Sequence, residues 1–587
     1  MVIFEAIKFP TKQKRSSIKV ALLARYPLTI RAVLLGLLLG IMISFIGIYL
    51  YLKIGIMALG GIFLLGYLVL SATGGYDAKE NAIILTIVGA CMLSAMGFMD
   101  AMVALIVYKD YVTAEVTMTF PFLVSIILPG ILLGVFVLYP FYKEFMKLRW
   151  PMVTPMAYMV KVLEKTGSKE LRYAVKGMAF SSVTSISLML SGCYQIDFSG
   201  RKDKNTLNFT SIILSPLYGS IGFFISFISY VFLIIGVGYS MLVWFFIEGA
   251  NPSINLQQHF FNPYIYSVAI PMMITTAILT LIDYGKKLRT TIKSIATESR
   301  LTQLTSIISL TLLPVTAYVL LSITGALASS DLMDVIGIIV VALPIVFISS
   351  IFAVRASGET GFSSSFTLDA TLILTLLIFS PSFESILIAF AIIGVFESMA
   401  ISLMRRIKFC SIIGVEPKNV IEAVMIGGII GAIFGPWIFL IIHHYQGGIG
   451  SGLWPAPMAK LLGGYVLLFY TAIKQRRLPP MIKPELLIIS IFATICIWFV
   501  LRKIGLRNLS PILIAIGMII PPSFLWIASI GALIDFRLHK KFKEKPEVYK
   551  EEKSKWNAIL AGVMSGEGIV IFILTMLAIL PLIIGFL

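Results

Sequence analysis

Apolar stretches of about twenty residues recur along the chain from Ala32 to its end, and short polar segments separate them. A run of this length lets an α-helix cross the hydrocarbon core of a bilayer, whereas transmembrane β-strands are about ten residues long and alternate apolar with polar positions. The sequence therefore predicts an all-α polytopic membrane protein with about 16 to 17 transmembrane helices. We expect spans near residues 31–52, 54–72, 82–108, 119–141, 174–193, 208–222, 224–247, 264–284, 303–327, 333–354, 365–380, 384–404, 417–442, 458–473, 485–501, 510–534 and 557–586.

The distribution of lysine and arginine among the loops predicts the orientation of these spans. If the basic arm of residues 1–30 is cytoplasmic, alternation also places the basic loops 142–173, 285–302, 405–408, 474–484 and 535–556 inside. Loops 249–263, 328–333 and 443–457 then lie outside and contain no Lys or Arg, whereas the outer loops 194–207 and 502–509 deviate by carrying basic residues. The positive-inside rule thus favours a multi-pass protein of the cell membrane with a cytoplasmic N-terminus.

Composition supports a membrane protein and argues against a soluble protein that binds nucleic acid. Of the 587 residues, 58% are hydrophobic and only 13% are charged, whereas soluble domains carry about 25% charged residues. A net charge of +18 would indicate nucleic acid binding in a soluble protein. Here the basic residues mark loops that face an anionic lipid surface, so we expect the lipid bilayer and no nucleic acid as a partner.

Two similar segments begin with a Trp-Pro pair. One is "LRWPMVTPMAYMVKVL", with Trp150, Pro151, Pro155 and Lys161, and the other is "GLWPAPMAKLLGGYVL", with Trp454, Pro455, Pro457 and Lys460. Proline suits the first turn of a helix and forces the preceding residue into an extended conformation. Each segment therefore predicts a broken or re-entrant helix, which a membrane tolerates only where protein or a cavity surrounds it. The alternative is an ordinary helix that starts with proline and has an interfacial tryptophan.

The two Trp-Pro segments fall on opposite sides of the predicted membrane. This placement is typical of inverted repeats, whose substrate sites lie near the bilayer midplane. We therefore predict two repeat halves, residues 31–302 and 303–587, after the N-terminal arm.

Ionisable side chains inside spans are costly and usually functional. Asp100, Glu397 and Glu567 lie within predicted spans, Glu80 opens the third span, and Glu359 lies in the Gly-broken stretch "RASGETGFSSSF". We interpret them as candidates for binding the coupling proton. The structural alternatives are a carboxylate at a helix start for Glu80, a solvated loop residue for Glu359, and polar contacts between helices for Glu397 and Glu567.

Several motifs of enzymes and metal sites are absent from the sequence. There is no GxxxxGK[ST], HExxH, GxSxG or CxxC pattern, and the four cysteines are scattered singly through apolar segments. These absences argue against an ATPase, a familiar hydrolase and a metal centre. We expect no cofactor, no resident metal and no enzymatic activity.

Seven stretches in order resemble the oligopeptide transporter (OPT) family, including its yellow-stripe-like branch. They are "TIRAVLLGLLLGIMISFIGIYLYLKIG", "ENAIILTIVGA", the first Trp-Pro segment, "SPLYGSIGFFISFISYVFLIIGVGYSMLVW", "RASGETGFSSS", "GLWPAPMAKL" and "GVMSGEGI". In the first Trp-Pro segment, Lys161 stands where an acidic residue is common in the family. The resemblance spans nearly the whole chain and implies a secondary transporter, usually proton-coupled, of small peptides or peptide-like metal chelates.

These observations lead to a specific prediction of function and site. We expect a secondary active, proton-coupled transporter whose substrate contacts Trp150, Pro151, Pro155, Lys161, Glu359, Trp454, Pro455, Pro457 and Lys460. Protons would bind Glu80, Asp100, Glu359, Glu397 or Glu567, and a homo-oligomer is compatible with the sequence. Two alternatives are a membrane-embedded enzyme acting on a lipid-linked substrate and a scaffold subunit that transports nothing.

Overall fold

The computed structural model describes residues 27–54, 70, 75, 77–112, 116–164, 168–197, 211–225, 227–251, 254, 256–295, 300–361, 367–445, 448–451, 454–506 and 509–584. Most of these residues are helical, which confirms the predicted all-α class. The helices are α2 (Ile30–Ile54), α4 (Ala78–Met96), α5 (Met99–Val107), η1 (Lys109–Tyr111), α6 (Phe120–Val137), η2 (Tyr139–Phe141), α7 (Tyr142–Phe145), α8 (Val153–Leu163), α9 (Lys169–Leu190), α10 (Pro216–Phe224), α11 (Phe227–Phe246), α12 (Leu256–Phe260), α13 (Pro263–Ile295), α14 (Arg300–Thr324), α15 (Ser329–Thr360), α16 (Thr367–Ile378), α17 (Phe383–Ile413), α18 (Pro417–Tyr445), α19 (Pro457–Lys474), α20 (Pro484–Lys503), α21 (Ile512–Ile519), α22 (Pro522–Lys541) and α23 (Pro546–Ile584).

Eleven helical stretches in the described part of the chain are long and apolar enough to cross a membrane. One of them, Ala78–Val107, combines α4 and α5, and the set confirms a multi-pass membrane protein. Other predicted spans correspond to shorter or more polar helices such as α9, α10 and α19. The predicted span 54–72 lies almost entirely outside the described residues.

Predicted spans differ from the helices of the structure in three places, one of which is the break between α4 and α5 inside the predicted span 82–108. The predicted span 510–534 is divided, because α21 ends at Ile519 and α22 begins at Pro522. The prolines Pro521 and Pro522 lack the N–H groups that would continue α21. The predicted span 208–222 begins with a strand instead, since β2 (Ser211–Ile213) pairs antiparallel with β1 (Gln195–Asp197) before α10 starts.

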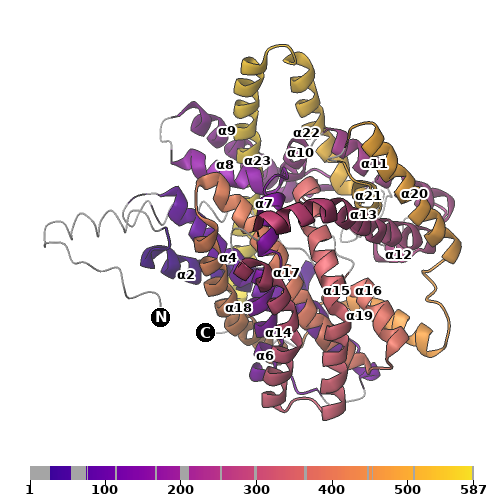
Figure 1. Ribbon diagram of the computed structural model, residues 1–587. Helices are drawn as coiled ribbons and strands as arrows, with labels where there is room; N and C mark the ends of the chain where they lie inside the picture. The colour runs from indigo at the N-terminus through magenta and orange to yellow at the C-terminus, as the bar shows by residue number, and fades with distance from the viewer. Residues whose placement is uncertain are drawn as a thin grey trace, which may run out of the picture.

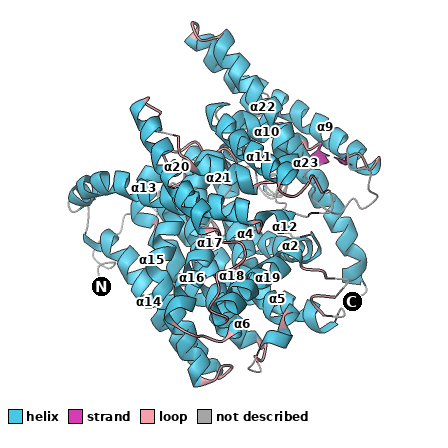
Figure 2. Ribbon diagram, turned by 90° about the vertical axis from the view of Figure 1, so that its right-hand side faces the viewer, coloured by secondary structure: helices cyan, strands magenta, loops and turns pink. Residues whose placement is uncertain are grey.

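The helices form two groups that lie one above the other in Figures 1 and 2. In the upper group, α9 packs against α23, α10 against α22, α11 against α21, and α13 against α20. In the lower group, α4 packs against α2 and α18, while α17 packs against α6 and α15. Both groups combine helices from the two predicted repeat halves, and α8 contacts both groups through α17 and α23.

Glycines allow the paired helices of the upper group to approach closely. A Cβ atom at Gly222 of α10 would overlap the backbone carbonyl group of Ala528 of α22. In the same way, Gly562 of α23 lies against the carbonyl group of Ala174 of α9. Small residues at such contacts let helix backbones pack tightly, which is a main source of helix association inside a bilayer.

The span Ala78–Val107 defines two ends of the bundle. At its start, Lys79 lies beside Gly414, the residue that caps α17. In the last turns of α17, Lys408 Nζ donates hydrogen bonds to the carbonyl groups of Met146 and Leu148, just before Trp150. We call this side of the bundle the Trp150 end.

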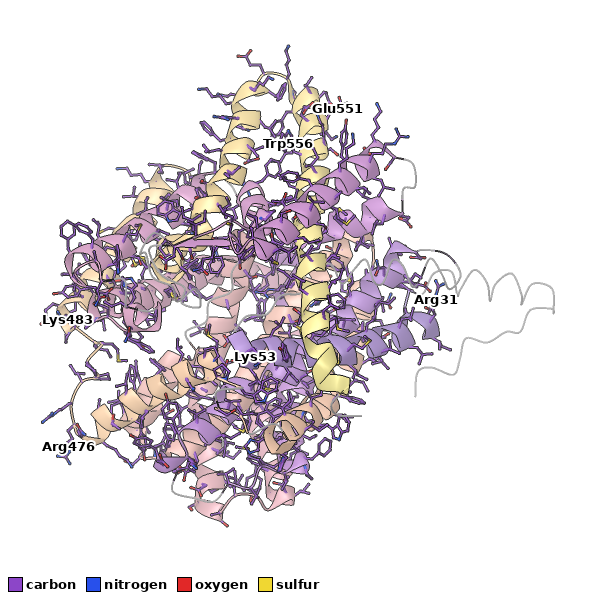
Figure 3. All side chains as sticks on the ribbon, turned by 180° about the vertical axis from the view of Figure 1, so that it is seen from behind. Arg31, Lys53, Arg476, Lys483, Glu551 and Trp556 are labelled. Carbon is purple, nitrogen blue, oxygen red and sulfur yellow. The ribbon has the colours of Figure 1, made fainter. Side chains whose placement is uncertain are left out.

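The opposite side of the bundle carries the second Trp-Pro segment. Near the last residue of α5, Val107, lies Gly450, whose N–H donates to the carbonyl oxygen of Trp454 at 2.9 Å. The N–H of Ala456 donates to the carbonyl oxygen of Leu52 at 2.8 Å, close to the end of α2. We call this side the Trp454 end. In Figure 3, Arg31 and Lys53 mark the two ends of α2.

Candidate functional site

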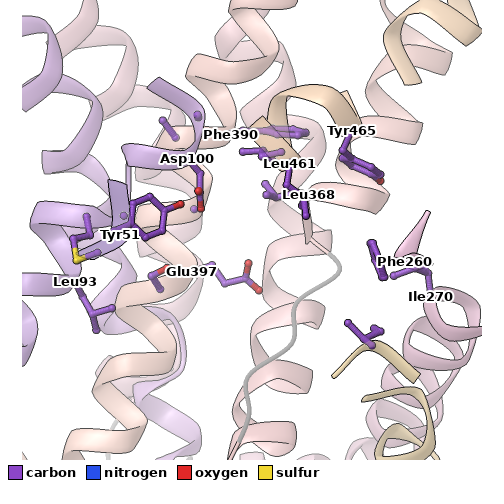
Figure 4. Close-up of a pocket in the computed structure, with 18 of the residues that line it drawn as sticks. Tyr51, Leu93, Asp100, Phe260, Ile270, Leu368, Phe390, Glu397, Leu461 and Tyr465 are labelled. Atoms are coloured by element: carbon purple, nitrogen blue, oxygen red, sulfur yellow. The ribbon is translucent and has the colours of Figure 1, made fainter. Parts of the chain in front are cut away.

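A cavity of about 400 Å³ lies between the two helix groups. The lower group contributes residues of α2, α4, α5, α16, α17 and α19, and the upper group contributes residues of α12, α13 and α21. Its lining is mainly apolar and aromatic, and it contains two acidic residues, Asp100 and Glu397. None of the described residues that line the cavity is basic. In Figure 4, Asp100 and Tyr51 lie on one side of the cavity, and Phe260, Ile270 and Tyr465 lie on the other.

Asp100 reaches the cavity because a break interrupts the span Ala78–Val107. Helix α4 ends at Met96 and α5 begins at Met99, which places Asp100 in the first turn of α5. The first turn of a helix favours negative charge, since its free N–H groups and dipole are positive there. Asp100 Oδ1 and the Tyr51 hydroxyl group are both buried, and neither has a hydrogen-bond partner among the described residues. Buried polar groups usually have partners, so these two are candidates for binding a ligand or a proton.

Glu397 comes to the same cavity because α17 crosses the break between α4 and α5 at close range. A Cβ atom at Gly97 would lie 3.1 Å from the Val395 side chain, and one at Gly394 would lie 3.6 Å from the Gly97 carbonyl oxygen. Both glycines line the cavity together with the acids that follow them, Asp100 and Glu397. The carboxyl group of Glu397 is buried, with 5% of the residue exposed. The two acids therefore share one mainly apolar cavity.

An aromatic cluster forms the wall of the cavity opposite the two acids. The rings of Phe261 and Tyr465 stack with centroids 5.7 Å apart. The hydroxyl groups of Tyr266 and Tyr465 lie 2.8 Å apart within hydrogen-bond distance. Such rings offer an apolar surface and faces that attract cations.

A buried histidine holds this wall in place. His259, next to Phe260 in α12, is 1% exposed. Its Nδ1 lies 2.7 Å from Glu248 Oε2, and its Nε2 lies 2.8 Å from Ser240 Oγ in α11. Asn262 Nδ2 also donates to Glu248 Oε1 at 2.7 Å. No sequence motif marks these residues as a site, since a single histidine in a predicted loop carries no recognisable signal.

The contacts run from Ser240 to His259 to Glu248, in the order of the serine, histidine and acid of a hydrolase triad. A nucleophilic serine must also be open to its substrate and lie beside donors for the developing oxyanion. Ser240 is 1% exposed and lies inside α11. The arrangement therefore serves to fix the segment that carries Phe260 and Phe261.

The first Trp-Pro segment forms a buried connection at the Trp150 end. Trp150 is completely buried and adopts a left-handed backbone conformation with φ 55°. Its N–H donates to the carbonyl oxygen of Gly358 in α15 at 2.7 Å, and its Nε1 donates to the carbonyl oxygen of Phe145 at 2.8 Å. Non-glycine residues in this region of φ cost about 1 to 3 kcal/mol and persist where the surroundings enforce them. Trp150 is thus a packed residue and is not interfacial.

The second Trp-Pro segment repeats this arrangement at the Trp454 end. Trp454 is 2% exposed, and its ring meets that of Tyr49 edge-on at 5.7 Å. Here Ala456 has the left-handed conformation, with φ 44°, and donates its N–H to α2. Pro457 starts α19, as expected for a proline in the first helical turn.

The predicted substrate-contacting residues do not line this cavity. The residues described around it include none of Trp150, Pro151, Pro155, Lys161, Glu359, Trp454, Pro455, Pro457 and Lys460. Lys161 is exposed near the end of α8. Helix α19 contributes Leu461 and Leu462, the two residues that follow Lys460.

Three of the five predicted proton-coupling acids lie outside the cavity and have partners. Glu80 accepts a hydrogen bond from Thr29 Oγ1 at 2.7 Å and forms an ion pair with Arg31. Glu359 Oε1 accepts from Arg355 Nε at 2.7 Å, one turn earlier in α15. The sequence therefore placed all five acids in one class, whereas in the structure Asp100 and Glu397 line the cavity and the other three lie elsewhere.

Glu567 of α23 is the most fully bonded of these acids. Its Oε1 accepts from the Tyr194 hydroxyl group at 2.7 Å and from Ser215 Oγ at 2.8 Å. Its Oε2 accepts from the backbone N–H of Leu217 at 2.7 Å. Ser215 caps α10, so the carboxylate binds the positive end of that helix.

No group of three or more His, Cys, Asp or Glu side chains suited to a metal ion occurs among the described residues. In comparisons with known proteins, the family model described as "OPT oligopeptide transporter protein" matches residues 27–578. No curated protein sequence matches the chain.

Proposed function

Since the chain belongs to the oligopeptide transporter (OPT) family, we propose that it is a secondary active, proton-coupled transporter of small peptides or peptide-like metal chelates. The observation that carries the proposal is the cavity between the helix groups, which contains Asp100 and Glu397 and no basic lining residue in the described part of the chain. Its volume of about 400 Å³ falls within the range of sites for small molecules.

The lining of the cavity suits a substrate with a cationic group and an apolar body. An ammonium group of a peptide forms charge-assisted hydrogen bonds with carboxylates such as Asp100 and Glu397. Apolar side chains of the substrate gain free energy by leaving water for the aromatic wall around Phe261 and Tyr465. The substrate's own carboxylate has no basic partner among the described lining residues, so it must lie outside the cavity or be screened by a metal.

The same two acids offer a route for coupling. An ionised carboxylate in an apolar space is unfavourable, and either a proton or a substrate ammonium group reduces this cost. In the proposed cycle, a proton and the substrate together neutralise Asp100 and Glu397 before the cavity changes its access. The buried Tyr51 hydroxyl group is placed to donate to a carboxylate or to the substrate.

The two Trp-Pro segments support alternating access through inverted repeats. At the Trp150 end, a segment of the first predicted half binds α15 of the second half, and at the Trp454 end, a segment of the second half binds α2 of the first. The helix pairs are also exchanged between the two predicted halves. Helix α4 of the first half packs on α18 of the second, and α17 of the second half packs on α6 of the first. In the same way, α9 packs on α23 and α20 packs on α13. We propose that the contacts of Trp150 with Gly358 and of Ala456 with Leu52 close the two ends in turn.

Uptake into proteoliposomes tests this proposal. A labelled pool of short peptides, and then the same pool loaded with metal, is offered with and without an inward-directed proton gradient. We expect accumulation driven by the gradient in the wild type, and loss of the gradient dependence in Asp100→Asn and Glu397→Gln. The control is Asp110→Asn, an exposed carboxylate in η1.

Two results would contradict the proposed function. One is a wild type that accumulates neither free peptides nor metal-loaded peptides under the gradient. The other is gradient-driven uptake that survives unchanged in both cavity variants.

A further inference from the structure

Helix α17 carries two arginines between the cavity and the Trp150 end. Glu397 lines the cavity, and Arg405 and Arg406 follow eight and nine residues later, which corresponds to about 12 Å along the helix axis. Ser398 also lines the cavity. Ser402 and Arg405 follow it at the four- and seven-residue spacings that share one helix face.

Arg406 is enclosed between α17 and α4. Its Nη1 donates to the carbonyl oxygen of Leu85 at 3.2 Å. Its Nε is buried and has no hydrogen-bond partner among the described residues. A Cβ atom at Gly89 of α4 would overlap the guanidinium group, so the glycine provides the space that the arginine occupies. A buried N–H donor without a partner, such as Nε of this partly buried arginine, is costly unless something binds it.

Arg405 points toward α15 and is held there by one contact. Its Nε donates to Ser357 Oγ at 2.9 Å. The Oγ of Ser402, one turn nearer the cavity, is buried without a hydrogen-bond partner in the described structure. Small polar groups of α15 and α17 thus lie between the cavity and Arg405.

Within the described part of the chain, neither arginine pairs with a carboxylate. No Asp or Glu of the described residues lies within ion-pair distance of Arg405 or Arg406, although the neighbouring Arg355 is paired with Glu359. The two arginines are adjacent in the chain, so α17 carries two like charges in one turn. Lys408 adds a third positive charge at this end. Charges inside membrane spans are normally paired, and these arginines are partly buried.

We propose that Arg405 and Arg406 form an anion-binding site that holds an oxyanion at the Trp150 end, either the carboxylate of a transported solute or the phosphate of a lipid headgroup. Arginine suits this role because its planar fork of N–H groups matches the two oxygens of a carboxylate or phosphate. The carboxylate alternative rests on the proposed function, since it places a solute's cationic group at Asp100 and Glu397 and its anionic group toward the arginines.

Thermal unfolding of the purified protein with added anions tests the site without any transport measurement. Acetate and inorganic phosphate are titrated against chloride at constant ionic strength, and phosphatidylglycerol is titrated into delipidated protein. We expect at least one of these three probes to raise the unfolding temperature of the wild type in a saturable manner. The apparent affinity should fall at least about tenfold, or 1.4 kcal/mol, in Arg405→Gln and Arg406→Gln.

The control is Arg149→Gln, which removes an exposed arginine from the same end and should leave the response unchanged. Stabilisation by acetate or phosphate identifies a site open to a solute, whereas stabilisation by phosphatidylglycerol alone identifies a lipid site. If Arg406→Gln does not fold, Arg405→Gln carries the comparison.

The proposal is overturned if no probe stabilises the wild type more than Arg405→Gln. Because this assay measures binding without transport, failure of peptide uptake and failure of the anion site are separate results.

Discussion

Replacement of Glu567 by glutamine separates a structural carboxylate from a proton-coupling one. Glutamine has the shape of glutamate but no charge, and one of its two terminal atoms is a donor. At position 567, one terminal atom accepts hydrogen bonds from Tyr194 and Ser215, and the other accepts one from the N–H of Leu217. If the amide NH₂ group takes the place of Oε2, it faces the N–H of Leu217, which can only donate. If it takes the place of Oε1, the hydroxyl groups of Tyr194 and Ser215 must turn to accept, and their own O–H groups lose the carboxylate as acceptor.

The contacts give the size of the expected effect. A buried donor left without its acceptor costs about 1 to 3 kcal/mol, and a bond to a charged group is stronger than a neutral one by about 1 kcal/mol. We therefore expect Glu567→Gln to lower the free energy of unfolding by about 3 kcal/mol. Tyr194→Phe removes one bond and should cost about half as much. Burial and the neighbouring Glu567 carboxylate raise the pKa of Tyr194, so its hydroxyl group remains a donor at neutral pH.

The assay combines unfolding with transport. Tryptophan fluorescence during titration with SDS in mixed micelles reports the free energy of unfolding, and the proteoliposome assay reports gradient-driven uptake. Glu551→Gln, an exposed glutamate of the same helix, is the matched control. We expect Glu567→Gln to be less stable but to keep its dependence on the proton gradient. Wild-type stability together with loss of gradient dependence would refute this reasoning and make Glu567 a coupling residue.

Three further predictions follow from contacts at other positions. Gly222→Ala should destabilise the protein by about 1 to 3 kcal/mol through overpacking, since its Cβ would overlap the Ala528 carbonyl group. The control Gly238→Ala in α11 meets no atom within 4 Å and should be neutral or stabilising by up to about 1 kcal/mol. Equal unfolding curves for the two variants would contradict the packing of α10 on α22. His259→Ala should raise the KM for peptide uptake more than it lowers kcat, because it releases the segment of Phe260 and Phe261, and His444→Ala, which removes an exposed histidine, should change neither constant. Arg31→Gln should cost less than about 1 kcal/mol and leave coupling intact, since its pair with Glu80 is partly exposed; loss of gradient dependence in this variant would return Glu80 to the candidate coupling residues.

The Trp-Pro segments illustrate what local sequence can predict. Proline restricts its own backbone and that of the preceding residue, so a helix start at Pro457 was predictable from the sequence. The left-handed conformations of Trp150 and Ala456 were not predictable, because their bonds to Gly358 and Leu52 come from helices far away in the sequence.

For the five acids too, the sequence does not predict which helices surround each one. Hydropathy identifies Asp100, Glu397 and Glu567 within predicted spans, because an ionisable group there interrupts an apolar run, whereas Glu80 opens a span and Glu359 lies in a polar stretch. What surrounds each acid depends on which helices pack against it. Glu567 meets the start of α10, and Glu80 meets Arg31, while Asp100 and Glu397 meet an apolar cavity.

The sequence by itself determined the all-α membrane class, because bilayer thickness imposes long apolar runs that no other fold requires. Its motifs also determined the family. Tertiary structure alone decided that the cavity lies where α17 crosses the break between α4 and α5, and that Phe260, Phe261 and Tyr465 face the two acids there. Such contacts depend on the relative placement of helices separated by hundreds of residues, which helix periodicity and residue composition do not encode locally.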